Sequence, residues 1–375
     1  KVIISLGVLV SLLLLVNIML LTSLNSTINS KEQQAKDASI PAELEIITIT
    51  TPNCKTCYNI SIIKSQLDGA NITSDIELES TDSKAQDLIE KYNITKLPAL
   101  ILKGETTKSP QISKMISEIG VTQEDSSVVI SALVPPYLDA RTGKLRGEVS
   151  LIVLSSQDCL QCFDIKPLIT QLKSTLSISK YEELDITSEK GQELKSTYHL
   201  EVLPTIIFDE EAAVYPMISQ VWPLVGSVES DGFYVMRNVN PPFYNISSEK
   251  VDGLISLTVV TDISCKTCYE AAKINKAILA QMGILIQDER NVDIASLSGK
   301  DILNKYNITK VPTIIMDGDM EKYPNLIQSW KSVGSVESDG SYILRKIDIF
   351  EQPYKNVETG EIVEPSPKTS PTTTT

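Results

Sequence analysis

The chain has 375 residues, of which 42% are hydrophobic, enough for two or three domains of about 100–200 residues with ordinary cores. It has 48 acidic against 34 basic residues, a net charge of −14, and no basic cluster, which excludes nucleic-acid binding through displaced phosphate counterions. His199 is the one histidine, so repeated histidine catalysis and histidine-rich metal sites are excluded as well.

The N-terminal segment is apolar. Residues 2–30 carry no charge, and residues 2–21 would span about 30 Å as a helix, the thickness of a bilayer core. The run exceeds the apolar region of a usual signal peptide and lacks a small-residue cleavage pattern. We expect residues 1–24 to form a membrane anchor, with a cleaved signal as the alternative, and residues 25–42 to form a polar linker. Lys1 places the near side in the cytoplasm, so the remaining chain is expected to be extracytoplasmic.

All six cysteines stand in C-x-x-C pairs that recur about every 105 residues: Cys54 with Cys57, Cys159 with Cys162, and Cys265 with Cys268. About 45 residues after each pair, a Tyr-containing segment ends in a proline: Pro98, Pro204 and Pro312. A fixed period indicates copies of one structural unit. The sequence therefore predicts three domains, at residues 43–134, 135–240 and 241–352, followed by a Pro/Thr-rich tail at 353–375.

Hydrophobic patterns alternate within each unit. In the middle unit, a Val/Leu-rich run at Val149–Leu154 predicts a buried strand before the cysteines, and Cys162–Leu176 has helical spacing. A second strand, a charged helix and a third strand follow, the last at Thr205–Phe208 beyond the proline. This β-α-β-α-β order predicts an α/β fold, a mixed sheet with helices on both faces. The Pro-Pro-Tyr and Thr-Gly segments between units predict turns and domain boundaries.

The cysteine pairs suggest thiol–disulfide chemistry. A C-x-x-C at a helix start places two sulfurs within disulfide reach and the first sulfur near backbone N–H groups that favour a thiolate. The first cysteine attacks and the second resolves the mixed disulfide. This predicts Cys54, Cys159 and Cys265 as nucleophiles and Cys57, Cys162 and Cys268 as resolving thiols. Lys55 and Lys266 should lower the pKa of the neighbouring thiol, so the middle pair, without a lysine, should hold the least thiolate.

The succession of strand, C-x-x-C, helix and Tyr-x-[IL]-x-x-[LV]-Pro resembles the thioredoxin-like superfamily over most of residues 43–350. The segment Thr51–Cys57 is similar to the entry of the tandem-domain protein disulfide oxidoreductases of archaea. The resemblance implies three tandem domains, each with a central mixed sheet, and a cis proline against the cysteine pair, beside which a substrate peptide binds like an added strand. It thereby implies cis bonds at Pro98, Pro204 and Pro312, and substrate-binding backbone groups at Leu97, Leu203 and Val311.

The sequence also departs from that family. No tryptophan precedes a first cysteine; Asn53, Asp158 and Ser264 stand there. The buried acid that assists the resolving cysteine in thioredoxins is replaced by Thr48, Val153 and Val259. These replacements weaken the expectation of fast reductase turnover.

The expected function is a membrane-anchored, extracytoplasmic thiol–disulfide oxidoreductase, acting on protein thiols and disulfides together with an unidentified redox partner. No organic cofactor and no metal is implied, because the sulfurs carry the electrons. Two other interpretations stay open. The pairs could be permanent structural disulfides in a redox-inactive surface spacer or interaction protein, or cysteines of two domains could share a zinc ion.

Overall fold

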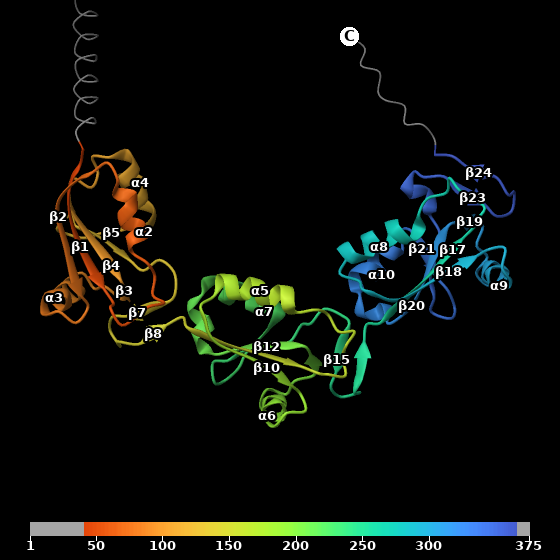
Figure 1. The fold of residues 1–375 in the computed structure, drawn as a ribbon, viewed down its shortest axis with the longest axis horizontal. Helices are drawn as coiled ribbons and strands as arrows, with labels where there is room; N and C mark the ends of the chain where they lie inside the picture. Colours follow the sequence, from red (N-terminus) through yellow and green to blue (C-terminus); the bar gives the residue numbers. More distant parts are fainter. Residues whose placement is uncertain (1–40, 366–375) are drawn as a thin grey trace, which may run out of the picture. The chain divides into compact units, whose positions relative to one another are not determined.

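The computed structural model describes residues 41–365, in two compact units, 41–148 and 149–365. The first unit holds one five-stranded mixed sheet and the second unit holds two of the same kind (Figure 1). We call the parts built on these sheets the first, middle and third domains. The predicted α/β class with a mixed central sheet is confirmed.

The first sheet has the strand order β2-β1-β4-β6-β5. Strand β1 (Glu43–Thr50) runs parallel to β2 (Asn71–Glu79) and antiparallel to β4 (Ala99–Gly104), with Ile46 opposite Leu102. The antiparallel strands β6 (Val128–Ser131) and β5 (Val121–Thr122) complete it. The hydrophobic run before the cysteines is therefore a central strand with both faces covered, as its unbroken Ile/Leu/Val content requires.

The other two sheets repeat this order. The middle sheet contains β10 (Ile178–Asp185), β9 (Val149–Ser155), β12 (Thr205–Phe208), β14 (Tyr234–Met236) and β13 (Gly226–Val228). The third sheet contains β18 (Ile286–Asp293), β17 (Ile255–Thr261), β20 (Thr313–Gly318), β22 (Tyr342–Leu344) and β21 (Gly334–Val336). In each sheet the strand before the cysteines lies beside the strand after the proline, which brings these two motifs together.

Helices cover both faces of each sheet (Figure 1). On one face lie α2 (Ser61–Lys64) and α4 (Pro110–Ile119), α5 (Lys166–Thr175) and α7 (Pro216–Val225), and α8 (Ala271–Gln281) and α10 (Pro324–Trp330). On the other lie α3 (Ser83–Lys91), α6 (Glu189–Tyr198) and α9 (Leu297–Tyr306). Successive residues of a strand face opposite sides. Thus Ile46 packs against α2 and α4, whereas Ile49 packs against α3.

A second, three-stranded sheet closes each domain. In the first domain β3 (Lys96–Leu97) pairs with β7 (Tyr137–Asp139), which pairs with β8 (Leu145–Arg146). The equivalent sets are β11 (Val202–Leu203) with β15 (Phe243–Asn245) and β16 (Lys250–Asp252), and β19 (Lys310–Val311) with β23 (Tyr354–Asn356) and β24 (Ile362–Val363). We call residues 135–146, 241–252 and 353–363 the closing hairpins.

The closing hairpins differ from the sequence expectation. The Pro-Pro-Tyr segment at 135–137 and the Pro-Pro-Phe segment at 241–243 were expected to begin the next domain, but each leads into a strand that pairs back with the preceding domain. Accordingly, the first unit ends at Glu148, and residues 353–363, expected as part of the tail, are folded. The physical reason is the edge of β3, β11 and β19, whose backbone groups need partners.

No helix within residues 41–365 is long and apolar enough to cross a membrane. The anchor expected at residues 1–24 lies outside the described residues, as do most of the expected linker and the end of the tail, residues 366–375.

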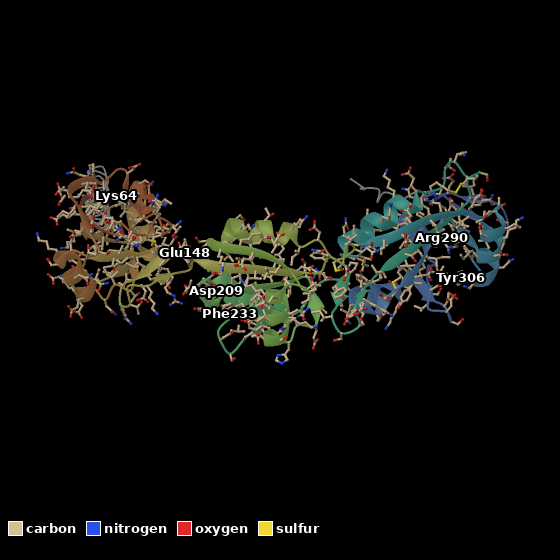
Figure 2. The ribbon with its side chains drawn as sticks, turned by 60° about the horizontal axis from the view of Figure 1, so that its bottom comes forward. Lys64, Glu148, Asp209, Phe233, Arg290 and Tyr306 are labelled. Carbon is tan, nitrogen blue, oxygen red and sulfur yellow. A yellow bond between two sulfur atoms is a disulfide. The ribbon has the colours of Figure 1, made fainter. Side chains whose placement is uncertain are left out.

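A tyrosine at the end of the helix on the second face ties it to a turn between two strands in every domain. Tyr92 donates to Asp125 (2.9 Å), Tyr198 to Asp231 (3.0 Å), and Tyr306, labelled in Figure 2, to Asp339 (2.9 Å). These aspartates lie in the turn segments that the sequence predicted. Each fixes the end of the helix that precedes the cis-proline strand, and so helps to position that strand without contacting the cysteines.

Gly226 begins β13 where the backbone of β14 comes very close. A Cβ added at Gly226 would lie 2.2 Å from the carbonyl oxygen of Val235. We therefore predict that Gly226→Ala destabilises the middle domain by about 2 kcal/mol, because the strand must shift to relieve the clash. Denaturant unfolding followed by Trp222 fluorescence, in a Trp330→Phe background, measures this. Leu224→Ala, at a side chain 74% exposed, is the control and should change stability by less than about 0.5 kcal/mol.

Candidate functional site

Each cysteine pair lies just beyond the end of the central strand that precedes it, with all six cysteines partly buried. The three pairs are disulfides with Cα–Cα distances of 5.4, 5.3 and 5.6 Å, within the usual range for this bond. The six predicted catalytic residues therefore form three local sites, one in each domain.

The peptide bonds before the repeated prolines are cis: Leu97–Pro98, Leu203–Pro204 and Val311–Pro312. The Sγ of Cys162 lies 3.6 Å from the carbonyl oxygen of Leu203, and Pro204 lines a cavity of about 380 Å³ together with Cys159 and Cys162. In the first domain, Cys54 and Leu97 line a cavity of about 400 Å³. In the first and middle domains the structure thus brings the proline segment and the cysteine pair together, as the resemblance implied.

The helix after each pair begins later than the sequence predicted. Helices were expected from Cys162 and Cys268, but α5 begins at Lys166 and α8 at Ala271, and α2 begins at Ser61, four residues after Cys57. In a helix that began at the pair, the residue after the second cysteine would donate to a carbonyl four residues earlier. Instead, Tyr58 donates to Pro136 (2.8 Å), Phe163 to Pro242 (2.7 Å) and Tyr269 to Pro353 (3.0 Å).

The later helix starts move the helix N-terminus, which would stabilise a thiolate, away from the first cysteine. The field of a helix terminus falls off within the first turn. Because every helix starts at least three residues beyond the second cysteine, the first sulfur lies outside that turn. In the disulfide form, therefore, no helix N-terminus lies at the first cysteine, and the expected thiolate there stays a prediction.

The backbone edge beside each cis proline is already occupied. Leu97 lies opposite Leu138, Leu203 opposite Tyr244, and Val311 opposite Lys355. Flanking bonds extend the pairing: Ala140 donates to Thr95 (3.0 Å), Ile246 to Glu201 (2.9 Å) and Val357 to Thr309 (2.8 Å). The residues expected to offer backbone hydrogen bonds to a substrate are thus hydrogen-bonded to a strand of their own chain.

The side chains expected to tune the thiols are exposed. Lys266 donates through its ammonium group to the carbonyl of Ile263 (2.9 Å), and Lys55 is solvent-exposed. In the disulfide form no thiol titrates, so the effect of both lysines on a thiol pKa stays a prediction, as does the low thiolate content of the middle pair.

The positions that hold a buried acid in thioredoxins are apolar or neutral and lie deep in the cores. Thr48, Val153 and Val259 are 4%, 4% and 3% exposed. Among the described residues, the hydroxyl of Thr48 has no hydrogen-bond partner. These positions offer no carboxylate to accept the proton of a resolving cysteine.

An ion pair that sequence reasoning missed lies beside the third cysteine pair. Asp262, three residues before Cys265, is buried and contacts the ammonium group of Lys355 on β23. It also accepts from the backbone and hydroxyl of Ser264, at 2.8 and 2.6 Å. Burial is the largest influence on the Asp262 pKa and raises it, but Lys355 and Ser264 together hold that pKa below its usual value. The sequence feature that could have indicated this ion pair is Asp262 itself, since the equivalent positions of the other two repeats hold Thr51 and Ser156.

No cluster of three or more His, Cys, Asp or Glu side chains able to hold a metal ion occurs in residues 41–365.

Lys355→Met tests how firmly this ion pair holds the third closing hairpin. Removing the cation leaves Asp262 buried and unpaired, which we predict costs about 3 kcal/mol at neutral pH. A carboxylate with a lowered pKa stabilises the fold above about pH 4 and loses that effect as the pH falls through its folded pKa. The difference from wild type should therefore shrink below pH 4. Unfolding followed by Trp330 fluorescence, in a Trp222→Phe background, measures it.

The matched control is Lys331→Met, which removes an exposed positive charge from the same domain and should change stability by less than about 0.5 kcal/mol. Equal losses for both variants would contradict a specific role of the Asp262–Lys355 pair.

No protein-family model and no curated protein matches the chain. Among solved structures, ERdj5 form I is 14% identical and has a TM-score of 0.15, covering 79% of this chain and 40% of that one. Human ERp44 is 11% identical with a TM-score of 0.15, and the match covers 84% of this chain and 94% of that one. A domain of the alkylhydroperoxide reductase AhpF of Enterococcus faecalis is 16% identical with a TM-score of 0.15, and the match covers 47% of this chain and 84% of that one. The chain spans less than half the length of the ERdj5 structure.

These similarities are too low to carry an argument, so the fold assignment rests on the chain's own features. Each domain has a central mixed sheet between helices, a C-x-x-C pair beyond the central strand, and a cis proline before the next strand of the sheet. The mixed sheet and the cis proline are features that the resemblance implied, and the cysteine pairs are among the motifs that carried it. The described residues therefore carry the thioredoxin-like fold three times.

Proposed function

We propose that the chain is a thiol–disulfide oxidoreductase that acts on protein substrates through its three cysteine pairs. The observation that carries this proposal is that each partly buried pair follows a strand that pairs with the strand after a cis proline, three times in one chain. A purely structural disulfide would stabilise a domain from many positions. The repeated placement at the end of a central strand, rather than at scattered positions, favours exchange chemistry.

The exchange needs no cofactor. A substrate thiolate attacks the Sγ of Cys54, a mixed disulfide forms, and the sulfur of Cys57 leaves as a thiolate. A second substrate thiolate then attacks the substrate sulfur of the mixed disulfide and releases Cys54. The substrate loses two electrons and gains a disulfide, and the pair gains two electrons. A partner disulfide must reoxidise the pair for turnover, and run in reverse the same steps reduce a substrate.

The competing candidate is a redox-inactive spacer or interaction protein at the cell surface. It is favoured by the occupied peptide edges, by helices that start beyond the cysteines, and by the absence of a carboxylate at Thr48, Val153 and Val259. In that case the disulfides only constrain the unfolded chain.

The reduction potentials of the three pairs separate the two functions. The chain, kept in detergent, is equilibrated with glutathione or dithiothreitol buffers, its thiols are trapped, and each pair is read by peptide mass spectrometry. For an oxidoreductase we expect at least one potential between about −120 and −270 mV, the span of known exchange catalysts. Three potentials well below about −300 mV would indicate permanent structural disulfides. They would refute the oxidoreductase and support the spacer or interaction protein.

We further propose that the domains are held on the extracytoplasmic side of a membrane by residues 1–24, supported by the uncharged, apolar run at residues 2–21. If so, a membrane-impermeant maleimide applied to intact cells after mild reduction should label the cysteines fully. In a matched variant with Lys residues added after the apolar run, labelling should fall, because positive charge there favours the cytoplasm. Labelling only after cell lysis would contradict the proposed location.

A further inference from the structure

The closing hairpin makes two separate contacts with the site in every domain. Its first strand pairs with the backbone of the residue before the cis proline: Leu97, Leu203 or Val311. Its proline carbonyl accepts from the residue after the second cysteine: Tyr58, Phe163 or Tyr269. One segment of the chain thus holds both sides of the disulfide, and it does so three times.

We propose that each closing hairpin is a displaceable cover that keeps its cysteine pair slow to react until an extended polypeptide, or a loss of hairpin contacts, removes it. This inference rests on the proposed function for its biological use, but the cover itself is a property of the structure. The cover occupies the edge at which an incoming strand would pair antiparallel with Leu97, Leu203 or Val311.

Removal of the cover also frees the N–H groups of Tyr58, Phe163 and Tyr269. A freed backbone N–H takes another acceptor, either water or a nearby carbonyl. The carbonyl four residues earlier belongs to the first cysteine of the pair in each repeat: Cys54, Cys159 and Cys265. Extension of α2, α5 and α8 to the pair would satisfy the N–H and place the first sulfur at a helix N-terminus, where a thiolate is favoured. Opening and activation are thereby coupled.

Side chains hold the first and third covers to their own sites. The third is held by the buried Asp262–Lys355 ion pair and by Lys310, on the strand before the cis proline, over the ring of Tyr354 (5.2 Å). The first is held in the same way by Lys96 over the ring of Tyr137 (4.8 Å). In addition, Thr56, between the cysteines, donates to Glu148 just after the first hairpin.

Among the described residues, no ion pair or cation–ring contact joins the middle cover to its own site, although Tyr244 packs in the cluster of Leu203. Val202 takes the place of Lys96 and Lys310 on the strand before the cis proline. The cation that does approach this hairpin is Lys322 of the third domain, 3.4 Å from Asp252 and 5.9 Å from the ring centre of Phe243. Since that contact does not join the hairpin to its own cysteine pair, the middle pair is expected to react first and the third pair last.

The test is the rate at which dithiothreitol reduces each disulfide in the whole chain. The reductant is oxidised to its cyclic disulfide, and each pair gains two electrons. Acid quenching, alkylation and peptide mass spectrometry give three rate constants from one sample. Leu138→Pro removes the N–H of Leu138 in the strand opposite Leu97. We expect it to raise the rate at Cys54–Cys57 at least tenfold and to leave the other two pairs, as internal controls, within twofold.

A second control separates opening of the cover from loss of stability. Ile112→Ala opens a cavity under α4, on the sheet face opposite to the one on which Leu138 packs, and should leave the rate at Cys54–Cys57 within twofold. Amide hydrogen exchange checks each variant: the amides of β1 and β4 must stay protected, and the amide of Leu97 must lose protection in Leu138→Pro alone. A rate increase of equal size in Ile112→Ala would overturn the cover.

A milder variant keeps the test decisive if Leu138→Pro does not fold. Lys355→Met leaves the backbone of the third hairpin intact and removes its ion pair, so the rate at Cys265–Cys268 should rise about threefold with the other pairs unchanged. An unchanged rate in both variants, with the hairpin amides exchanging freely, would refute the cover. The reduction potentials report separately on the proposed function. Potentials below about −300 mV with faster reduction in the variants would refute the oxidoreductase and leave the cover standing.

Discussion

The backbone edge beside the cis proline is the constraint on which each domain depends. A two-residue strand at the border of a site carries N–H and C=O groups that must find partners, in water or in protein. In this chain β3, β11 and β19 find them in β7, β15 and β23, each about 40 residues further along. Completing that edge determines where each domain ends and what can approach its cysteines.

The same pairing governs the conformation around the disulfide. The N–H after the second cysteine has two competing acceptors, a hairpin carbonyl and the carbonyl that would begin the helix. With the hairpin in place, the helix starts at least three residues after the second cysteine. The electrostatic field of its N-terminus therefore does not reach the sulfur of the first cysteine. Under the proposed cover, a redox site and a permanent structural disulfide would be two states of one architecture, which differ in the placement of a short hairpin.

The sequence predicted the features that repeat locally or that composition determines. The central strands, the strands after the prolines and the cysteine pairs came from hydrophobic runs and spacing, since buried strands have a clear signature. The cis bonds came only from the family resemblance. The closing hairpins were missed because strands of two or three residues have no detectable period, and their pairing connects Leu97 to Leu138 across the whole β4–β6 segment. The late helix starts were missed for the same reason: their cause is a non-local hydrogen bond.

Differences among the copies show which features the architecture needs. All three keep the proline carbonyl contact and the antiparallel register, which use backbone atoms alone. The side chains that fix the hairpin vary, from a buried Asp262–Lys355 pair in the third domain to the more distant Lys322 of a neighbouring domain at the middle one. A contact made by the backbone survives substitution, whereas side chains adjust its strength. If the hairpins are displaceable covers, as proposed, three copies of one site would differ in how readily they open while their folds stay the same.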